Sequence, residues 1–169
     1  MTIAPRAQRN FILQQGLPGP DERACPAQYS ALLFQPRLVA LILVAAVVLQ
    51  APLLFFLLAA ALWFSAAVPR LNPFDALYNR ILARSSGISL SPARPPRRFA
   101  QFMAGSFAIA IGVFLALGWR MTAYVLEGVF VAAVGALAFG AFCLGSFLFH
   151  LISGRVRFAA RTLPWAKGV

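Results

Sequence analysis

Residues 70–98, RLNPFDALYNRILARSSGISLSPARPPRR, decide the fold of this chain. The stretch is basic and separates two long apolar blocks. Residues 38–68 carry no charge, and residues 99–152 carry only Arg120 and Glu127. Apolar runs of this length are typical of membrane-spanning helices. We therefore predict an all-α integral membrane protein with two transmembrane hairpins joined by a basic loop.

The composition favours a membrane protein and argues against a nucleic-acid partner. Of the 169 residues, 61% are hydrophobic and 11% are charged, which leaves too little polar material to cover a soluble domain. The net charge of +11 would suit nucleic acid, but the basic residues flank apolar runs and do not cluster beside stacking aromatics. Cations in such positions are typical of contacts with anionic lipid headgroups. The predicted partner is therefore the lipid bilayer, and no nucleic acid is expected.

The first apolar block allows two interpretations. Residues 38–68 can form one bent helix, kinked at Pro52, or a hairpin of two short helices over 36–51 and 52–68. In the hairpin arrangement, 14 of the 15 basic residues lie on one side of the membrane and only Arg120 lies opposite. With a single helix the bias weakens to 10 against 5. The positive-inside rule therefore favours the hairpin, with both chain ends cytoplasmic.

The domain organisation follows from this topology. We expect a flexible cytoplasmic tail over residues 1–26, a membrane domain over 27–152, and a basic cytoplasmic segment over 153–169. The four membrane helices are expected at about 36–51, 52–68, 99–117 and 122–152.

An amphipathic helix is predicted in the middle loop, over about residues 73–84. Asn72 can cap this helix, and Asp75 lies in its first turn, where the helix dipole favours an anion. Leu77 and Ile81 fall on its apolar face, so we expect the helix to lie on the cytoplasmic leaflet with Asp75 pointing away from that face. The arginines expected to contact lipid headgroups are Arg37, Arg80, Arg84, Arg97, Arg98, Arg155 and Arg157.

Small residues recur every four positions in the last two predicted membrane helices. The first set runs from Ala100 to Ala116, and the second comprises Gly128, Ala132, Ala136 and Gly140. Small side chains let helix backbones approach closely in lipid. We therefore expect the two sets to face each other across an antiparallel hairpin.

Two cysteines and a histidine define a candidate thiol site. On a continuous helix, His150 falls within about 20° of Cys143, and Cys25 starts the membrane domain on the same side. If Cys25 and Cys143 approach each other, His150 can act as a base, which suggests a thiol-dependent membrane redox enzyme or relay using Cys143. The alternative is that Cys143 is a small core residue and His150 a polar helix end. These three side chains fall short of a closed metal site, and neither a metal nor a cofactor is expected.

Glu127 is the one acidic residue inside the predicted spans. A buried carboxylate in a membrane is costly and is often functional, as a proton or cation contact or as an anchor for a partner subunit. The position of Glu127 near the outer edge favours the alternative, in which it reaches the outer interface and pairs with Arg120. If Glu127 is instead buried and functional, a small transporter or lipid-handling protein stays among the candidates.

Three short stretches give the chain a resemblance to a known family. They read NPFDALYNR at 72–80, PRRFAQ at 96–101 and FCLGS at 142–146, and Cys25-Pro26 precedes them. In this order and spacing they resemble the DUF4395 family of uncharacterised bacterial membrane proteins, over about residues 25–152. The resemblance implies four membrane helices in the bacterial cytoplasmic (inner) membrane and implies little about activity.

The expected function follows from the chemistry that the chain offers. The sequence contains no phosphate loop, serine triad or zinc-protease motif. We therefore expect a non-catalytic integral membrane protein, namely an accessory or structural subunit of a bacterial membrane assembly. Its expected protein partner is a membrane protein complex or a second copy of the chain in a homo-oligomer. A thiol-dependent enzyme and a small transporter or lipid-handling protein are the alternatives.

Overall fold

The computed structural model describes residues 4–167, and every regular element in that range is a helix. Residues 1–3 and 168–169, at the ends of the predicted terminal segments, lie outside the described residues. The elements in chain order are α1 (Pro5–Gln14), α2 (Cys25–Leu32), α3 (Phe34–Leu49), α4 (Pro52–Ala67), the 3-10 turn η1 (Pro69–Leu71), α5 (Pro73–Ile81), α6 (Ala83–Ser86), α7 (Pro95–Ala116), α8 (Arg120–Gly140), α9 (Leu144–Ile152) and α10 (Val156–Arg161).

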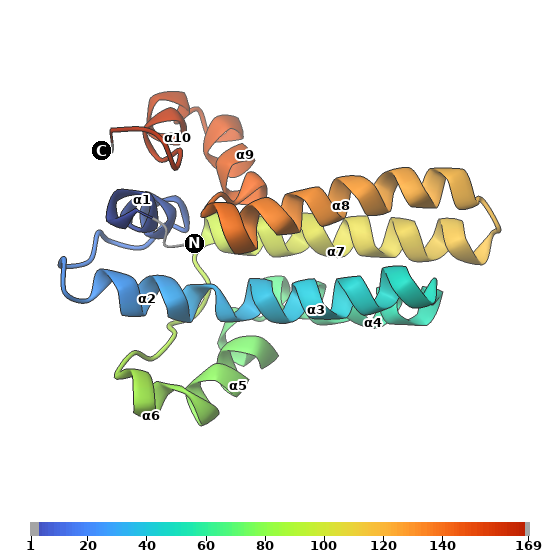
Figure 1. Cartoon of the computed structure of the whole chain (residues 1–169), viewed down its shortest axis with the longest axis horizontal. Helices are drawn as coiled ribbons and strands as arrows, with labels where there is room; N and C mark the ends of the chain where they lie inside the picture. The colour runs from blue at the N-terminus through green and yellow to red at the C-terminus, as the bar shows by residue number, and fades with distance from the viewer. Residues whose placement is uncertain (1–3, 168–169) are drawn as a thin grey trace.

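Two antiparallel helix hairpins, α3–α4 and α7–α8, lie side by side with both turns at the same end of the molecule (Figure 1). In the first hairpin the chain turns at Gln50, which adopts a left-handed conformation with φ of 47°. Pro52 then occupies the start of α4, where its missing N–H leaves no helical hydrogen bond unmade. The prediction that residues 38–68 form two helices, and not one bent rod, is confirmed.

Three helical stretches are long and apolar enough to cross a membrane, namely Cys25–Leu49, Pro95–Ala116 and Arg120–Gly140. The first of them joins α2 and α3 end to end. Helix α4 is also apolar but has 16 residues. At 1.5 Å per residue it measures about 24 Å, which is less than the ~30 Å hydrocarbon core of a bilayer. The predicted all-α fold with long apolar helices is therefore confirmed, while α4 is shorter than a typical span.

The most extensive contact of α7 is with α4, and not with α8 as predicted. A Cβ added at Gly105 would overlap the Trp63 ring, and one added at Gly112 would lie 2.7 Å from Phe56 Cε1. The indole Nε1 of Trp63 also donates a hydrogen bond of 3.2 Å to the Phe102 carbonyl oxygen. Helix α7 therefore uses its small residues to accommodate aromatic side chains of α4.

The second set of small residues, on α8, faces outward. A Cβ added at Gly128 or at Gly140 would meet no atom within 4 Å, and Ala132 is exposed. The predicted pairing of the two sets is therefore wrong. The physical reason is that aromatic rings of α4 pack against the small residues of α7. The small residues of α8 are therefore left uncovered.

The predicted fourth helix, residues 122–152, is divided into α8 and α9. Helix α8 ends at Gly140, and Ala141 turns the chain through a left-handed conformation with φ of 52°. Helix α9 then bends away from the axis of α8 and packs on the start of α7 (Figure 1). The prediction of one continuous helix is therefore wrong. No proline or charged residue marks the break, so the local sequence does not indicate it. The packing of α9 depends on Gly145, where an added Cβ would lie 2.6 Å from Ala100 Cα.

The predicted flexible tail contains the packed helix α1. Phe11 and Ile12 of this helix are 1% and 0% exposed, and the Phe11 ring meets Tyr29 of α2 edge to face at 5.4 Å between centroids. Asn10 Nδ2 donates a hydrogen bond of 2.9 Å to the Leu163 carbonyl oxygen near the other end of the chain. The prediction of a flexible tail over residues 1–26 is therefore wrong for α1. Two apolar residues among polar neighbours are enough to anchor this helix, because their packing partners are distant in sequence.

Helix α5 turns its acidic side toward the hairpins. Phe74 and Asp75 are buried, whereas Leu77 and Ile81 are 41% and 61% exposed. Asp75 therefore lies on another face than Leu77 and Ile81, as predicted, but that face is buried against the hairpins and does not point away from the protein. The orientation follows from an ion pair between Asp75 and Arg97 of α7.

Replacing Gly145 with alanine is expected to push α9 away from α7, because the added Cβ would meet backbone atoms of Ala100, which cannot rotate aside. We expect the free energy of unfolding in detergent to fall by about 1–3 kcal/mol, as in other overpacked sites. A denaturant titration followed by tryptophan fluorescence measures this change. Gly128→Ala is the matched control, since it adds the same methyl group in open space. An equal loss of stability in both variants would contradict the close α7–α9 contact.

Candidate functional site

A buried ion pair lies at the end of the hairpins opposite their turns. Arg97 Nη2 is 2.5 Å from Asp75 Oδ1, and Arg97 Nη1 is 3.2 Å from Asp75 Oδ2, so the guanidinium contacts both carboxylate oxygens. The two side chains are 9% and 8% exposed, and theirs is the one ion pair within residues 4–167. Bidentate pairs of this kind are among the strong charge-assisted hydrogen bonds.

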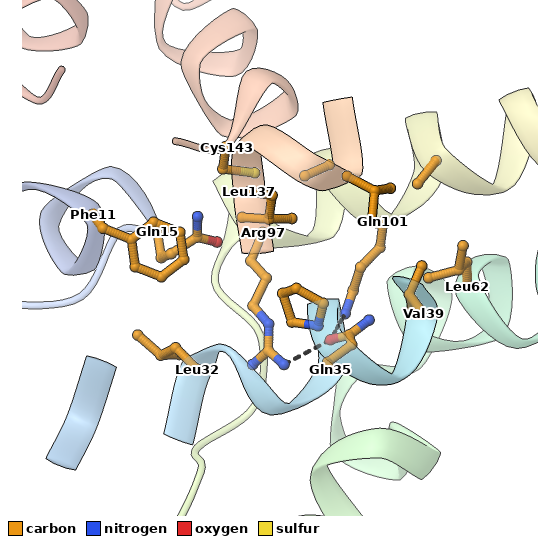
Figure 2. Close-up of a pocket in the computed structure, with 14 residues that line it drawn as sticks. Phe11, Gln15, Leu32, Gln35, Val39, Leu62, Arg97, Gln101, Leu137 and Cys143 are labelled. Atoms are coloured by element: carbon orange, nitrogen blue, oxygen red, sulfur yellow. Dashed lines mark hydrogen bonds between the residues drawn. The ribbon is translucent and has the colours of Figure 1, made fainter. Parts of the chain in front are cut away.

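Two glutamines extend the ion pair toward the centre of the hairpins. Gln35 Oε1 of α3 accepts hydrogen bonds from Arg97 Nη2 at 2.7 Å and from Gln101 Nε2 at 2.9 Å (Figure 2). Arg97 and Gln101 are one helical turn apart on α7, and so their side chains converge on the same oxygen. The arrangement joins α3 to α7 through polar contacts that are closed to solvent.

Asn72 connects the ion pair to the end of α4. Its Nδ2 donates a hydrogen bond of 3.1 Å to Asp75 Oδ2, and its Oδ1 accepts one of 3.2 Å from Ser65 Oγ. The same Oδ1 accepts a 3.0 Å hydrogen bond from the Phe74 backbone N–H, which confirms the predicted N-cap of this helix. The polar network thus ties α3, α4, α5 and α7 together, and we name it the ion-pair network. Its six members are Gln35, Ser65, Asn72, Asp75, Arg97 and Gln101.

The expected headgroup contacts divide into two groups. Arg97 is buried in the ion-pair network, so its predicted contact with lipid is wrong, because the Asp75 carboxylate holds it inside. The other arginines of the set are exposed, and among them Arg98 donates a 2.8 Å hydrogen bond from Nε to the Ala66 carbonyl oxygen. Headgroup contact stays a prediction for Arg37, Arg80, Arg84, Arg98, Arg155 and Arg157.

Cys143 and His150 both meet the last residue of α1. The Cys143 backbone N–H donates a 2.9 Å hydrogen bond to Gln14 Oε1, and His150 Nε2 lies 3.1 Å from the Gln14 carbonyl oxygen. Because a carbonyl oxygen only accepts, Nε2 is the protonated ring nitrogen in this arrangement. Ser146, between them on α9, donates from Oγ to the Pro96 carbonyl oxygen at 3.3 Å. Helix α9 is therefore clamped between α1 and α7.

The environment of His150 keeps its ring neutral. Burial lowers the pKa of this side chain below the ordinary value of 6.5, while its hydrogen bond to Gln14 opposes the shift and Arg155 reinforces it. The ring also packs edge-on against Phe158 at 4.8 Å between centroids. With the pKa lowered, the imidazole is uncharged at pH 7 and acts as a hydrogen-bond donor to α1. Its protonated nitrogen is engaged by a backbone carbonyl.

The two cysteines lie in different surroundings. Both are buried and neither forms a disulfide. Cys25 lines a cleft together with Arg9 of α1, whereas Cys143 lines a separate cavity together with Gln15. Within the described range, no group of three or more histidine, cysteine or acidic side chains is placed to hold a metal ion. Thiol reactivity at Cys25 and Cys143 stays a prediction.

Two small cavities meet at Cys143, with volumes of about 70 Å³ and 90 Å³. The first is lined by residues of α1, α2, α3, α4, α7 and α8, and Figure 2 shows Gln15, Arg97 and Gln101 among them. Gln15 Nε2 and Gln101 Oε1 are buried there without a hydrogen-bond partner. Both volumes are well below the roughly 300–1,000 Å³ of ligand pockets. The first cavity suits ordered water, which would satisfy the two amide atoms, whereas the lining of the second is apolar.

Glu127 is buried at the opposite end of the hairpins, with 4% exposure. Both of its carboxylate oxygens lie 3.2 Å from Gln50 Nε2, at the turn between α3 and α4. The expected pairing with Arg120 at the outer interface is not found. The physical reason is the position of the α3–α4 turn beside α8, which brings an amide donor to the carboxylate.

The fold and the ion-pair network define an all-helical protein in which two apolar hairpins are joined at one end by buried polar contacts. The family model of a domain of unknown function, DUF4395, matches residues 30–153, and the chain belongs to this family. The match includes the whole ion-pair network, Cys143 and His150, and it leaves out α1 and α10. No curated protein and no solved structure matches the chain.

Removing one partner of the buried ion pair is expected to destabilise the protein strongly. Arg97→Gln leaves the Asp75 carboxylate buried without its cation, which typically costs about 3–5 kcal/mol. The free energy of unfolding in detergent measures this loss. Asp75→Asn combined with Arg97→Gln should recover part of it, because no charge is then left unpaired. Arg84→Gln, at an exposed position, is the control. Equal stability of Arg97→Gln and Arg84→Gln would contradict the structural role of the pair.

Proposed function

We propose that the chain is an integral membrane protein that crosses the bilayer four times. The observation that carries this proposal is the band of exposed apolar side chains along the hairpins. A soluble protein rarely leaves so much contiguous apolar surface in water, whereas acyl chains cover such a surface at no cost. The band includes Leu41, Val48, Leu53, Leu57, Val113, Val125, Val129 and Phe139.

The charge distribution supports an orientation with both described ends of the chain in the cytoplasm. The turns of the two hairpins share one end of the molecule, and helices α1, α5, α6, α9 and α10 share the other (Figure 1). Arg120 lies at the turn end, and the other basic residues belong to the opposite end or to segments leading there. The short helix α4 then requires a locally thinned bilayer, an adjustment that membranes make at modest cost.

Labelling of single cysteines tests this topology. In a background of Cys25→Ser and Cys143→Ser, we expect Met121→Cys, at the α7–α8 turn, to react with a membrane-impermeant maleimide added to intact cells. Ser85→Cys, at an exposed position of α6, should react only after the cells are opened. Reaction of both sites from the same side of the membrane would contradict four crossings.

We further propose that the protein is an accessory or structural subunit of a membrane assembly. The small side of α8 supports this role, because Gly128, Ala132 and Gly140 leave room for another transmembrane helix to approach closely. The interior of the hairpins is filled by Leu43, Phe55 and further buried apolar side chains. A filled interior favours a packing role over passage of a substrate.

A bulky side chain on α8 is expected to release the partner. Ala132→Phe fills the open side of α8, so a protein that copurifies in stoichiometric amount from native membranes should be lost while the monomer stays folded. Val48→Phe is the control, since Val48 of α3 is 75% exposed in the apolar band. Native gels of the affinity-purified protein report the outcome. A wild-type protein that runs alone, without any stoichiometric partner or second copy, would count against the subunit role.

A further inference from the structure

A large basic cleft lies at the end of the molecule that is farthest from the hairpin turns. It has a volume of about 670 Å³ and is bounded by α1, the loop that follows it, the start of α2 and the C-terminal segment. This is several times the volume of either cavity beside Cys143, and it falls in the size range of ligand pockets. The ion-pair network and the apolar band are elsewhere in the fold, so neither accounts for this cleft.

The walls of the cleft carry an excess of positive charge. Arg6 and Arg9 of α1 and Lys167 of the C-terminal segment line it, and Glu22 is the one acidic residue among the lining side chains. None of these three cations forms an ion pair within the described residues. Three cations gathered around a hollow repel one another unless an anion lies between them.

The cleft is held in shape by contacts outside its charged lining. Asn10 Nδ2 donates hydrogen bonds to the carbonyl oxygens of Leu163 at 2.9 Å and Ala166 at 3.3 Å, which fixes the C-terminal wall against α1. The buried Phe11 anchors α1 on α2. The Arg9 guanidinium lies against Gly19 of the loop, since a Cβ added there would be 3.4 Å from Arg9 Nε. The helix and the C-terminal segment that carry the cations are therefore held by a packed scaffold before any ligand arrives, and the side chains of Arg6, Arg9 and Lys167 are exposed and accessible.

The position of the cleft along the membrane normal limits the kinds of ligand that can reach it. The continuous stretch Cys25–Leu49 has 25 residues, which is about 37 Å at 1.5 Å per residue. Even a full hydrocarbon core of ~30 Å, without the local thinning proposed at α4, would end before Cys25 if it started at the hairpin turn. Cys25 lines the cleft, so the cleft lies at the level of the lipid headgroups or in the adjacent water, where charged ligands are accessible.

We propose that this cleft binds a phosphate group, either on a soluble phosphorylated molecule or on the headgroup of an anionic lipid. Guanidinium groups match phosphate oxygens in a bidentate geometry, and a lysine ammonium adds a mobile positive charge. The inference goes beyond the accessory role proposed above and does not depend on it, because the cleft is formed within one chain.

Calorimetric titration of the purified full chain with inorganic pyrophosphate, in an uncharged detergent, tests whether the cleft binds a soluble phosphorylated molecule. We expect saturable binding that weakens at least about tenfold in Arg9→Gln and in Lys167→Gln, as charged hydrogen bonds predict. Arg9→Lys should keep part of the affinity, because it keeps the charge and loses the planar fork. Arg84→Gln and Arg157→Gln are matched controls, since both remove an exposed arginine outside the cleft.

Nanodiscs of phosphatidylcholine with and without phosphatidic acid test the lipid arm. Retention of phosphatidic acid by the wild type in native mass spectrometry, with loss in Arg9→Gln and not in Arg70→Gln, identifies the headgroup as the source of the phosphate. Arg70 is the control in this arm because it is exposed, lies outside the cleft and is not among the predicted headgroup contacts. If the cleft variants bind pyrophosphate more weakly but retain no less phosphatidic acid than the wild type, the ligand is a soluble phosphorylated molecule. The proposal is overturned if the cleft variants and the controls lose affinity equally in both arms, which would mean that the overall positive charge attracts anions without a site.

Discussion

The burial of Asp75 and Arg97 is the constraint on which the arrangement of the elements opposite the hairpin turns depends. Taking two charges out of water costs several kcal/mol for each ion, and only close, fully hydrogen-bonded geometry recovers that cost. Gln35 and Asn72 complete this geometry on either side of the pair. Helix α5 must therefore return to the hairpins after the chain leaves α4, and α7 must start where Arg97 can reach it. The amphipathic helix α5 therefore connects the two hairpins.

A second constraint comes from side-chain size inside the apolar region. Phe56 and Trp63 of α4 occupy the positions that Gly112 and Gly105 leave free on α7. These aromatic rings cover the small residues of α7, whereas the small residues of α8 stay uncovered. Polar contacts at both ends, the ion-pair network on one side and Gln50 with Glu127 on the other, hold the hairpins in register. The apolar middle is free to be shaped by packing alone.

The elements that local sequence determines could be predicted, and those that depend on distant partners could not. Charge and hydropathy indicate the two hairpins, and Pro52 marks the turn in the first of them. The inward direction of Asp75 depends on Arg97, 22 residues later. Likewise, Cys143 finds a side-chain acceptor in Gln14, 129 residues earlier. Periodicity carries no information about such partners, so it predicts neither the break before α9 nor the contact of the Glu127 carboxylate with Gln50.

The hydrogen bonds of Asn10 have a consequence for biosynthesis. Its two carbonyl acceptors lie 153 and 156 residues further along the chain. A ribosome delivers α1 long before these acceptors emerge, so the helix must wait for them while the hairpins form. The basic cleft, whose far wall is Lys167, is accordingly completed after the hairpins. A polypeptide truncated before Leu163 would lack the two acceptors that hold this wall, so an occupied cleft would distinguish the chain that carries them from the truncated one.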